Sequence, residues 1–372
     1  MVPGCPARRL ALGVAFVLSV TAFSFAVNPV PTITGPVRPQ AVAPGGGAFT
    51  LTVYGANFVS GAKVSWNQKA RATTFVSARE LKAKILESDI AKPTAGFISV
   101  TNPAPGGGVS SSSYGLVEVH EPTSKISLST VNNYMPGDAL FYLVTADFNN
   151  DGVPDIAAAD GSGYIFVYLG NGDATFRRAS AITNFLAGGN FAYGDFDGDG
   201  NLDLAFASGF EDASQITVVL GNGDGTFRPG STFGKFDHYP VLAVGDFNRD
   251  GKLDAVVAAD NSVGFYVFVF LGKGDGTFTQ KAKYPARNPY FVTTADLNGD
   301  GTLDVIFNYL LDGCCKPAIA TMMGKGDGTF GKPHVVAKPV PGCAPPFVLD
   351  DFNGDGNIDL AFCNGNRIGV QL

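Results

Sequence analysis

Five short stretches of the chain place aspartate or asparagine at every second position. The densest, GDFDGDGNLDLAF at residues 194–206, carries Asp195, Asp197, Asp199, Asn201 and Asp203. Neighbouring carboxylates repel one another, so this crowding is unfavourable unless a positive partner is present. Oxygen donors at positions 1, 3, 5 and 9, with glycine at position 6, match the first half of an EF-hand loop, whose ligands converge on one ion. The pattern predicts a divalent-cation site, and this number of hard oxygen ligands favours Ca²⁺ over Mg²⁺.

The same pattern occurs in four further stretches, ADFNNDGVPDIAA from Ala146, GDFNRDGKLDAVV from Gly245, ADLNGDGTLDVIF from Ala295 and DDFNGDGNIDLAF from Asp350. We number these loops 1 to 5 along the chain and count positions from the first aspartate of each. The predicted ligands are the side chains at positions 1, 3, 5 and 9 and the backbone carbonyl at position 7. They are Asp147, Asn149, Asp151, Val153 and Asp155; Asp195, Asp197, Asp199, Asn201 and Asp203; Asp246, Asn248, Asp250, Lys252 and Asp254; Asp296, Asn298, Asp300, Thr302 and Asp304; and Asp351, Asn353, Asp355, Asn357 and Asp359.

The five predicted sites differ in charge. Loop 2 has four carboxylates in the motif, whereas asparagine replaces the second ligand in the others, so loop 2 is expected to bind calcium most tightly. The alternative is that the loops are only turns, which aspartate, asparagine and glycine favour by themselves. Five copies with one spacing favour calcium, at about five ions per chain. Because no catalytic group lies beside the loops, the predicted role of the metal is to hold each loop in place.

The loops recur with a period near fifty residues, their first aspartates lying at 147, 195, 246, 296 and 351. A second motif runs in step, as LGNGDATF from Leu169, LGNGDGTF from Leu220, LGKGDGTF from Leu271 and MGKGDGTF from Met323. Short apolar runs around both motifs predict four strands per repeat, which is the make-up of a propeller blade. The glycines of GDGTF indicate positive φ in a hairpin, so we interpret Asp224, Asp275 and Asp327 as turn residues.

The two ends of the repeat array are complementary. The last repeat stops at IGVQL, one outer strand short, and the chain before loop 1 offers a spare strand near Lys125 to Val131. If that strand completes the last repeat, a five-bladed ring closes and no edge is left exposed. The alternative is an open or truncated array.

Residues from about 124 to 372 resemble the FG-GAP or VCBS repeats of integrin α-subunit propellers and of many secreted bacterial proteins. The resemblance implies calcium-binding blades whose acidic loops join the inner two strands on one face, with the opposite face open to ligands. The family commonly has seven blades, and this chain departs from it with five loops.

The chain before the repeats has alternating short strands punctuated by glycine and proline, which predicts a small Ig-like β-sandwich over residues 27–119. Its stretch LTVYGANFVSGAKVSW resembles an IPT/TIG domain at Gly55, Phe58, Gly61, Ala62 and Val64, and VTNPAPGGGVS resembles the terminal hairpin of such a domain. Trp66 is expected to pack in the core or at an edge rather than bind a ligand. Residues 120–125 are the predicted linker, and 126–372 the calcium-binding propeller. The whole chain is therefore predicted to be all-β.

Residues 1–26 read as a signal peptide, with Arg8 and Arg9 before an apolar run and small residues before a cleavage point after Ala26. An uncleaved membrane anchor is the alternative. Cleavage leaves 24 basic residues against 33 acidic ones, a formal charge of −9 that disfavours nucleic acid and anionic lipid as partners. The predicted location is secreted, either extracellular or periplasmic, with no membrane insertion after cleavage. Disulfides are then possible among Cys314, Cys315, Cys343 and Cys363, without a fixed pairing.

No catalytic constellation is evident in the sequence. His120, His238 and His334 are scattered without metal-ligand spacing, so an enzyme is not expected. The predicted function is a secreted calcium-binding repeat protein that acts as a binding or adhesion module, with a protein or carbohydrate ligand at the cell surface. Candidate ligand residues lie in two loops between blades, Asp237, His238 and Tyr239, and Arg287, Asn288 and Tyr290. The alternatives are a lectin-like or polysaccharide-processing propeller and a purely structural surface protein.

Overall fold

The computed structural model describes residues 27–34, 37–110, 115–119, 139–173, 175–185, 190–210, 213–237, 240–310, 317–338, 347–350, 352, 358–364 and 367–371. This part of the chain is all-β, apart from one 3₁₀ turn at Glu87–Asp89. It holds no helix that is long and apolar enough to cross a membrane. The predicted leader, the linker, the strand near Lys125 to Val131 and the side chains of the four cysteines named above lie outside the described residues.

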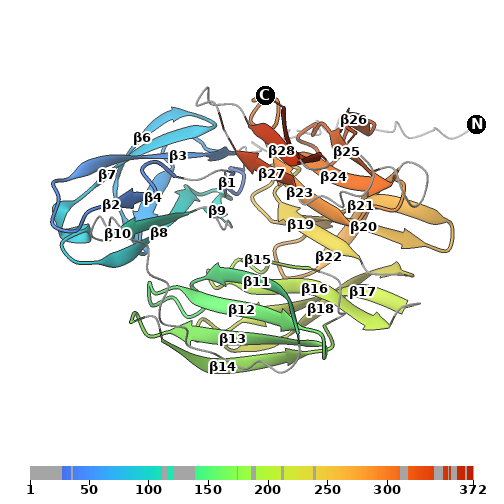
Figure 1. Cartoon of the computed structure of the whole chain (residues 1–372), viewed down its shortest axis with the longest axis horizontal. Coiled ribbons are helices and arrows are strands. Elements are labelled where there is room, and N and C mark those ends of the chain that lie inside the picture. Colours follow the sequence, from blue (N-terminus) through green and yellow to red (C-terminus); the bar gives the residue numbers. More distant parts are fainter. Residues whose placement is uncertain are drawn as a thin grey trace, which may run out of the picture.

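The first ten strands form an N-terminal sandwich of two sheets (Figure 1). One sheet has the order β1-β3-β7-β6 and the other the order β2-β10-β8-β4-β5, with β9 paired to β8. The strands are β1 (Thr32–Ile33), β2 (Ala41–Val42), β3 (Phe49–Ala56), β4 (Lys63–Trp66), β5 (Lys69–Ala70), β6 (Ala72–Ser77), β7 (Glu80–Ile85), β8 (Thr94–Asn102), β9 (Gly108–Val109) and β10 (Leu116–Val119). Both sheets contribute to one apolar core, in which Trp66 is buried as expected. The pairing of β8 with β9 confirms the predicted hairpin, while the IPT/TIG assignment stays a prediction.

The remaining strands form five consecutive sheets, which follow one another around an arc (Figure 1). Sheets 1 to 4 have four antiparallel strands each, as predicted, and sheet 5 has three. The strands are β11 (Leu140–Ala146), β12 (Asp155–Asp160), β13 (Tyr164–Gly170) and β14 (Phe176–Thr183); β15 (Phe191–Gly194), β16 (Asp203–Phe210), β17 (Ala213–Gly221) and β18 (Phe227–Phe236); β19 (Val241–Gly245), β20 (Asp254–Asn261), β21 (Gly264–Gly272) and β22 (Phe278–Pro285); β23 (Phe291–Ala295), β24 (Asp304–Leu310), β25 (Pro317–Met322) and β26 (His334–Ala337); and β27 (Phe347–Asp350), β28 (Asp359–Asn364) and β29 (Arg367–Gln371). Among the described residues no strand pairs sheet 1 with sheet 5, and ring closure stays a prediction.

The strand register places every acidic loop at the same edge of its sheet. In sheets 1 to 4, the residue before the first aspartate pairs with the aspartate at position 9, as Gly245 does with Asp254. The GDGTF-type turns join the third and fourth strands, so they lie at this edge too. We call it the loop edge. The hairpins between second and third strands and the connections between sheets lie at the opposite edge.

Adjacent sheets pack through cores that they share, and the loops take part. The phenylalanine at position 2 of loop 3, Phe247, is buried and lies 5.5 Å from Phe330 of the next sheet, measured between ring centroids. Its carbonyl accepts a hydrogen bond from the N–H of Gly328, 3.0 Å away, in the next turn motif. Loops 1 and 2 make the equivalent bonds to Gly225 and Gly276. Each of these loops is therefore fixed from its own sheet and from the following one.

The first strands of sheets 1 to 4 surround the middle of the arc. They line a cavity of about 200 Å³ together with Thr32 and Ile33 of β1, so the N-terminal sandwich meets the sheets there. Val30 and Ala56 of the sandwich belong to the apolar cores of the repeat sheets. The sandwich is thus packed against the array.

Candidate metal centres

Loops 1 to 4 are described in full. In each, backbone N–H groups of the loop donate hydrogen bonds to the carboxylate at position 1. In loop 1, Asp147 Oδ1 accepts a hydrogen bond from the N–H of Asp151 (3.1 Å), and Oδ2 accepts one from Gly152 (2.8 Å). Loops 3 and 4 repeat both bonds, and in loop 2 the N–H donors come from Gly198 and Gly200. The glycine at position 6 has a φ between 81° and 87° in all four, a region that glycine enters without steric cost. The sharp turn predicted from the motif is confirmed.

Asparagine at position 3 makes hydrogen bonds within the loop that the sequence did not indicate. Asn149, Asn248 and Asn298 each donate from Nδ2 to the carboxylate at position 5, over 2.8 to 3.1 Å. The side-chain oxygen of each accepts the N–H of the same aspartate. The donated hydrogen bond stabilises the ionised carboxylate at position 5. The same side-chain oxygen is the atom predicted to bind a cation.

The aspartate at position 9 ties the loop to the third strand of its sheet. Both oxygens of Asp254 accept backbone N–H groups, Oδ2 from Phe247 and Oδ1 from Gly272, each at 2.9 Å. Asp155, Asp203 and Asp304 make the same two bonds in their sheets. All four side chains are fully buried. Sequence reasoning assigned position 9 only to the metal, although a glycine at the end of the third strand, 15 to 20 residues further on, recurs in each repeat and is the donor in this second role.

Of the four loops that the structure describes, loop 2 is the one that brings three carboxylates together. Single carboxylate oxygens of Asp195, Asp197 and Asp203 all lie within 4.8 Å of one another. Calcium binds oxygen at 2.3 to 2.6 Å, so ligands around one ion are separated by up to about 5 Å. The donor set and its spacing therefore fit calcium, with Asp199 and the carbonyl of Asn201 as the further predicted ligands.

Burial raises the pKa of the aspartate at position 9 in loops 1 to 4. Desolvation, with smaller contributions from the neighbouring carboxylates, raises the pKa of Asp203 to about 7 and that of Asp254 to about 8. The same cause raises the pKa of Asp155 and Asp304 to about 6. At neutral pH a cation that binds Asp254 has to displace a proton. At neutral pH the carboxyls of Asp203 and Asp254 are therefore partly protonated, whereas those of Asp155 and Asp304 are mostly ionised.

Arg228 supplies positive charge to loop 2 from the fourth strand of the same sheet. Its Nη2 lies 2.7 Å from Asp197 Oδ2 and 3.5 Å from Asp199 Oδ2. Asp197 is the carboxylate that makes loop 2 differ from the others, so the arginine offsets the extra charge. This contact spans 31 residues, and the motif gave no indication of it.

Replacing this arginine is expected to tighten calcium binding at loop 2. The substitution Arg228→Gln removes a positive charge a few ångströms from the predicted ion and should raise its affinity about three- to tenfold in low salt. Calorimetric titration with Ca²⁺ measures the change. Lys235→Gln is the matched control, because Lys235 lies exposed near the far end of the same strand. Equal affinities in the wild type and Arg228→Gln would contradict the expectation.

The remaining predicted ligands are those of loop 5 and the residues at position 7 of each loop. Asp351, Asn353, Asp355 and Asn357 of loop 5 lie outside the described residues, whereas Asp359 is buried and accepts the N–H of Phe352 at 2.9 Å. At position 7, the N–H groups of Val153, Asn201, Lys252 and Thr302 donate to the aspartate at position 5. The carbonyl groups at position 7 remain predicted ligands.

The predicted turn residues are confirmed. Asp224, Asp275 and Asp327 each accept the N–H and the hydroxyl of the threonine two residues later. These hydrogen bonds lower the pKa of each carboxyl. The glycines on both sides of Asp224 have φ values of 75° and 82°. The motif thus forms a hairpin turn at the loop edge of sheets 2, 3 and 4.

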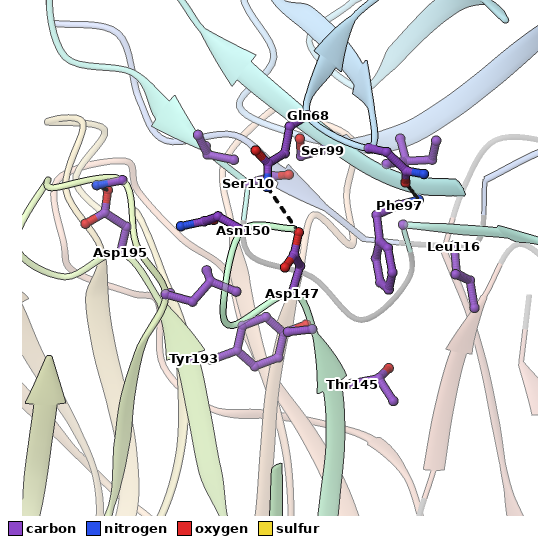
Figure 2. A pocket seen from close by; sticks show the side chains of 18 residues that line it. Gln68, Phe97, Ser99, Ser110, Leu116, Thr145, Asp147, Asn150, Tyr193 and Asp195 are labelled. Carbon is purple, nitrogen blue, oxygen red and sulfur yellow. Dashed lines mark hydrogen bonds between the residues drawn. The ribbon is translucent and has the colours of Figure 1, made fainter. Parts of the chain in front are cut away.

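A cavity of about 140 Å³ lies between the N-terminal sandwich and loops 1 and 2 (Figure 2). Asp147 and Asp195 line it from the two loops, and Gln68 and Phe97 line it from the sandwich. A hydrogen bond of 3.1 Å joins Gln68 Nε2 to Asp147 Oδ2 (Figure 2). The N-terminal part of the chain therefore reaches the acidic loops directly.

Several solved structures share a distant similarity with this chain. Among solved structures, an auxiliary nutrient binding protein from Bacteroides ovatus is 12% identical, with 92% of this chain and 83% of that one covered and a TM-score of 0.39. A lectin from Aleuria aurantia is 9% identical, with 92% and 96% covered and a TM-score of 0.41. Similarities this distant do not indicate what this chain binds. A search of curated proteins finds no match.

The repeat itself is recognised at the level of sequence families. The FG-GAP-like repeat family matches three overlapping stretches, residues 147–206, 195–257 and 246–307. Each stretch begins at the first aspartate of an acidic loop and ends in the second strand of the next sheet. The middle of this chain, residues 147–307, therefore consists of FG-GAP-like repeats in tandem.

Proposed function

We propose that this chain is a secreted calcium-binding protein that acts as a binding or adhesion module at or outside the cell surface. The observation that carries the proposal is the common geometry of loops 1 to 4, which hold a fitting set of oxygen donors in consecutive FG-GAP-like repeats. We assign the calcium a structural role, with no catalytic step. About five ions would bring the formal charge after leader cleavage from −9 to about +1.

A ligand surface is proposed at the edge opposite the loops. The sandwich packs against the loop edge, which leaves the far edge as the more open surface among the described residues. Apolar side chains are exposed on the hairpins there, with Val263 at 75%, Tyr164 at 40% and Phe265 at 39%. Exposed aromatic rings suit recognition of a protein side chain or of the apolar face of a sugar.

Four of the six ligand residues predicted from the sequence are described, and they lie at this same edge. Asp237 and Asn288 are half-buried, and Arg287 is exposed, in the connections before the first strands of sheets 3 and 4. Tyr290 is partly buried, and burial raises the pKa of its hydroxyl. His238 and Tyr239 lie outside the described residues. The exposed hairpin aromatics are therefore stronger candidates for ligand contact than most of this set.

The proposal is tested by offering the purified, calcium-loaded protein to arrays of immobilised glycans and of extracellular proteins. Binding to one class is expected, with loss on chelation and at least about tenfold weaker binding by Tyr164→Ala or Phe265→Ala. Phe75→Ala is the matched control, because Phe75 is also 39% exposed but lies on β6 of the sandwich.

Two other results would change the assignment. Release of sugars from a polysaccharide, without stable binding, would favour the alternative of a polysaccharide-processing protein. Equal binding by the wild type and both aromatic variants would contradict the proposed surface.

A further inference from the structure

The N-terminal sandwich contacts the first aspartate of three acidic loops, through a hydrogen bond at loops 1 and 3 and through an ion pair at loop 4. Gln68 Nε2 lies 3.1 Å from Asp147 of loop 1, the N–H of Val30 lies 2.7 Å from Asp246 of loop 3, and Arg79 Nε lies 3.4 Å from Asp296 of loop 4. The accepting atom is Oδ2 in every case, the same oxygen that accepts the N–H of the position 6 glycine. Three separate segments of the sandwich therefore reach one equivalent atom.

Packing at position 6 shows the same arrangement independently. A Cβ built on Gly251 of loop 3 would lie 2.7 Å from the carbonyl oxygen of Asn28 and 2.9 Å from Cα of Gly106, so only glycine fits there. In loop 1 the nearest atom to such a Cβ belongs to Asn67, and in loop 4 it belongs to Ala78. The backbone turn of each loop is thus part of the surface on which the sandwich rests.

Among the described residues, the sandwich makes no such contact with loop 2, although both line one cavity. A Cβ on its position 6 glycine, Gly200, would have no heavy atom within 4 Å. Asp195 accepts N–H groups of its own loop, and Arg228 from the same sheet forms an ion pair with Asp197. The described part of the sandwich therefore donates to the first aspartate of loops 1, 3 and 4 but not to that of loop 2.

The interface is continuous with the interior at loop 3. Asn57 is fully buried and donates from Nδ2 to the carbonyls of Val30 and of Asp246, at 3.2 and 3.4 Å. Val30 itself is buried in the core shared by sheets 2 and 3. Displacing the first aspartate of loop 3 would leave the N–H of Val30 without its acceptor, at a considerable cost for a buried donor.

We propose that the sandwich is an intramolecular partner of loops 1, 3 and 4, and that calcium in loops 1 and 3 strengthens its docking. This inference rests on the proposed calcium binding. A cation holds the mutually repelling carboxylates in the turn on which the sandwich packs, and the sandwich holds Oδ2 of the first ligand from outside. By linkage, each then raises the affinity of the other. At loop 4 the donor is charged, so Arg79 replaces part of the charge of a cation instead.

Hydrogen exchange of the purified protein, with Ca²⁺ and with a chelator, tests the coupling. The amide of Val30 is expected to exchange at least about tenfold faster without calcium, while amides paired between β3 and β7 inside the sandwich keep their protection. Equal loss of protection at β3 and β7 would overturn the inference, because calcium would then be needed for the fold of the sandwich rather than for its docking.

A substitution in the sandwich tests whether docking in turn affects calcium affinity. Gln68→Ala is expected to weaken calcium binding at one site about tenfold in a calorimetric titration, whereas the exposed control Gln40→Ala leaves it unchanged. Calcium binding with unchanged exchange at Val30 and unchanged affinity in Gln68→Ala would overturn this inference alone. Absence of any calcium binding by the wild type would overturn the proposed function as well.

Discussion

Removal of calcium is expected to lower the melting temperature of the protein by at least about 10 °C. A ligand that binds only the folded state stabilises it by about 2.7 kcal/mol per site when its concentration is a hundred times its dissociation constant. Two such sites supply about 5 kcal/mol, and a domain of this size shifts by roughly 2 to 4 °C per kcal/mol. The carboxylates that repel one another in loop 2, Asp195, Asp197 and Asp203, lose their common partner at the same time.

Scanning calorimetry with calcium and with a chelator measures this shift, and a titration of the stripped protein counts the ions. The expected count is about five, with loop 2 among the tighter sites because of its extra carboxylate. Magnesium is the matched control, since its stricter geometry should give a smaller shift. An unchanged melting temperature together with no heat of binding would contradict the calcium assignment for every loop.

Local features of the repeats could be predicted because each depends on residues close together in the sequence. The turn of loop 3 follows from the hydrogen bonds between Asp246 and Gly251, five residues apart. The turn at Asp275 follows from its bonds to Thr277. Strands begin at the position 9 aspartate and end at the LG motif, as at Asp254 and Gly272. A sequence that repeats such local patterns defines its sheets without further information.

Contacts between distant segments could not be predicted in this way. Val30 and Asp246 are separated by 216 residues, and Gln68 and Asp147 by 79. Nothing in the types of Val30 or Gln68 marks them as donors to an acidic loop, because any residue carries a backbone N–H and a surface glutamine has many uses. The packing of Gly251 on the sandwich has the same origin, since its positive φ already accounted for the glycine. The arrangement of the sandwich on the loops therefore appears only in the structure.

The substitution Asp254→Ala is expected to lower the free energy of unfolding in the presence of calcium by about 2 to 5 kcal/mol. It leaves the buried N–H groups of Phe247 and Gly272 without an acceptor and removes a predicted ligand. Urea unfolding measures the loss. Asp275→Ala in the exposed turn of the same sheet is the control, with a much smaller expected loss because the turn is open to water.

The loss should shrink when the same measurement is made with a chelator at pH 7. Because burial raises the pKa of Asp254 to about 8 in the metal-free chain, folding must then take up a proton that the unfolded chain releases. The contribution of this carboxyl to folding is therefore fully present below its unfolded pKa, near 4, declines as the pH rises above that value, and is lost above about 8. The alanine variant escapes this pH-dependent penalty, so its stability should approach that of the wild type as the pH is raised in chelator. An equal loss with calcium and with chelator, at every pH, would show that Asp254 acts only as a structural acceptor, and the calcium assignment of loop 3 would fail.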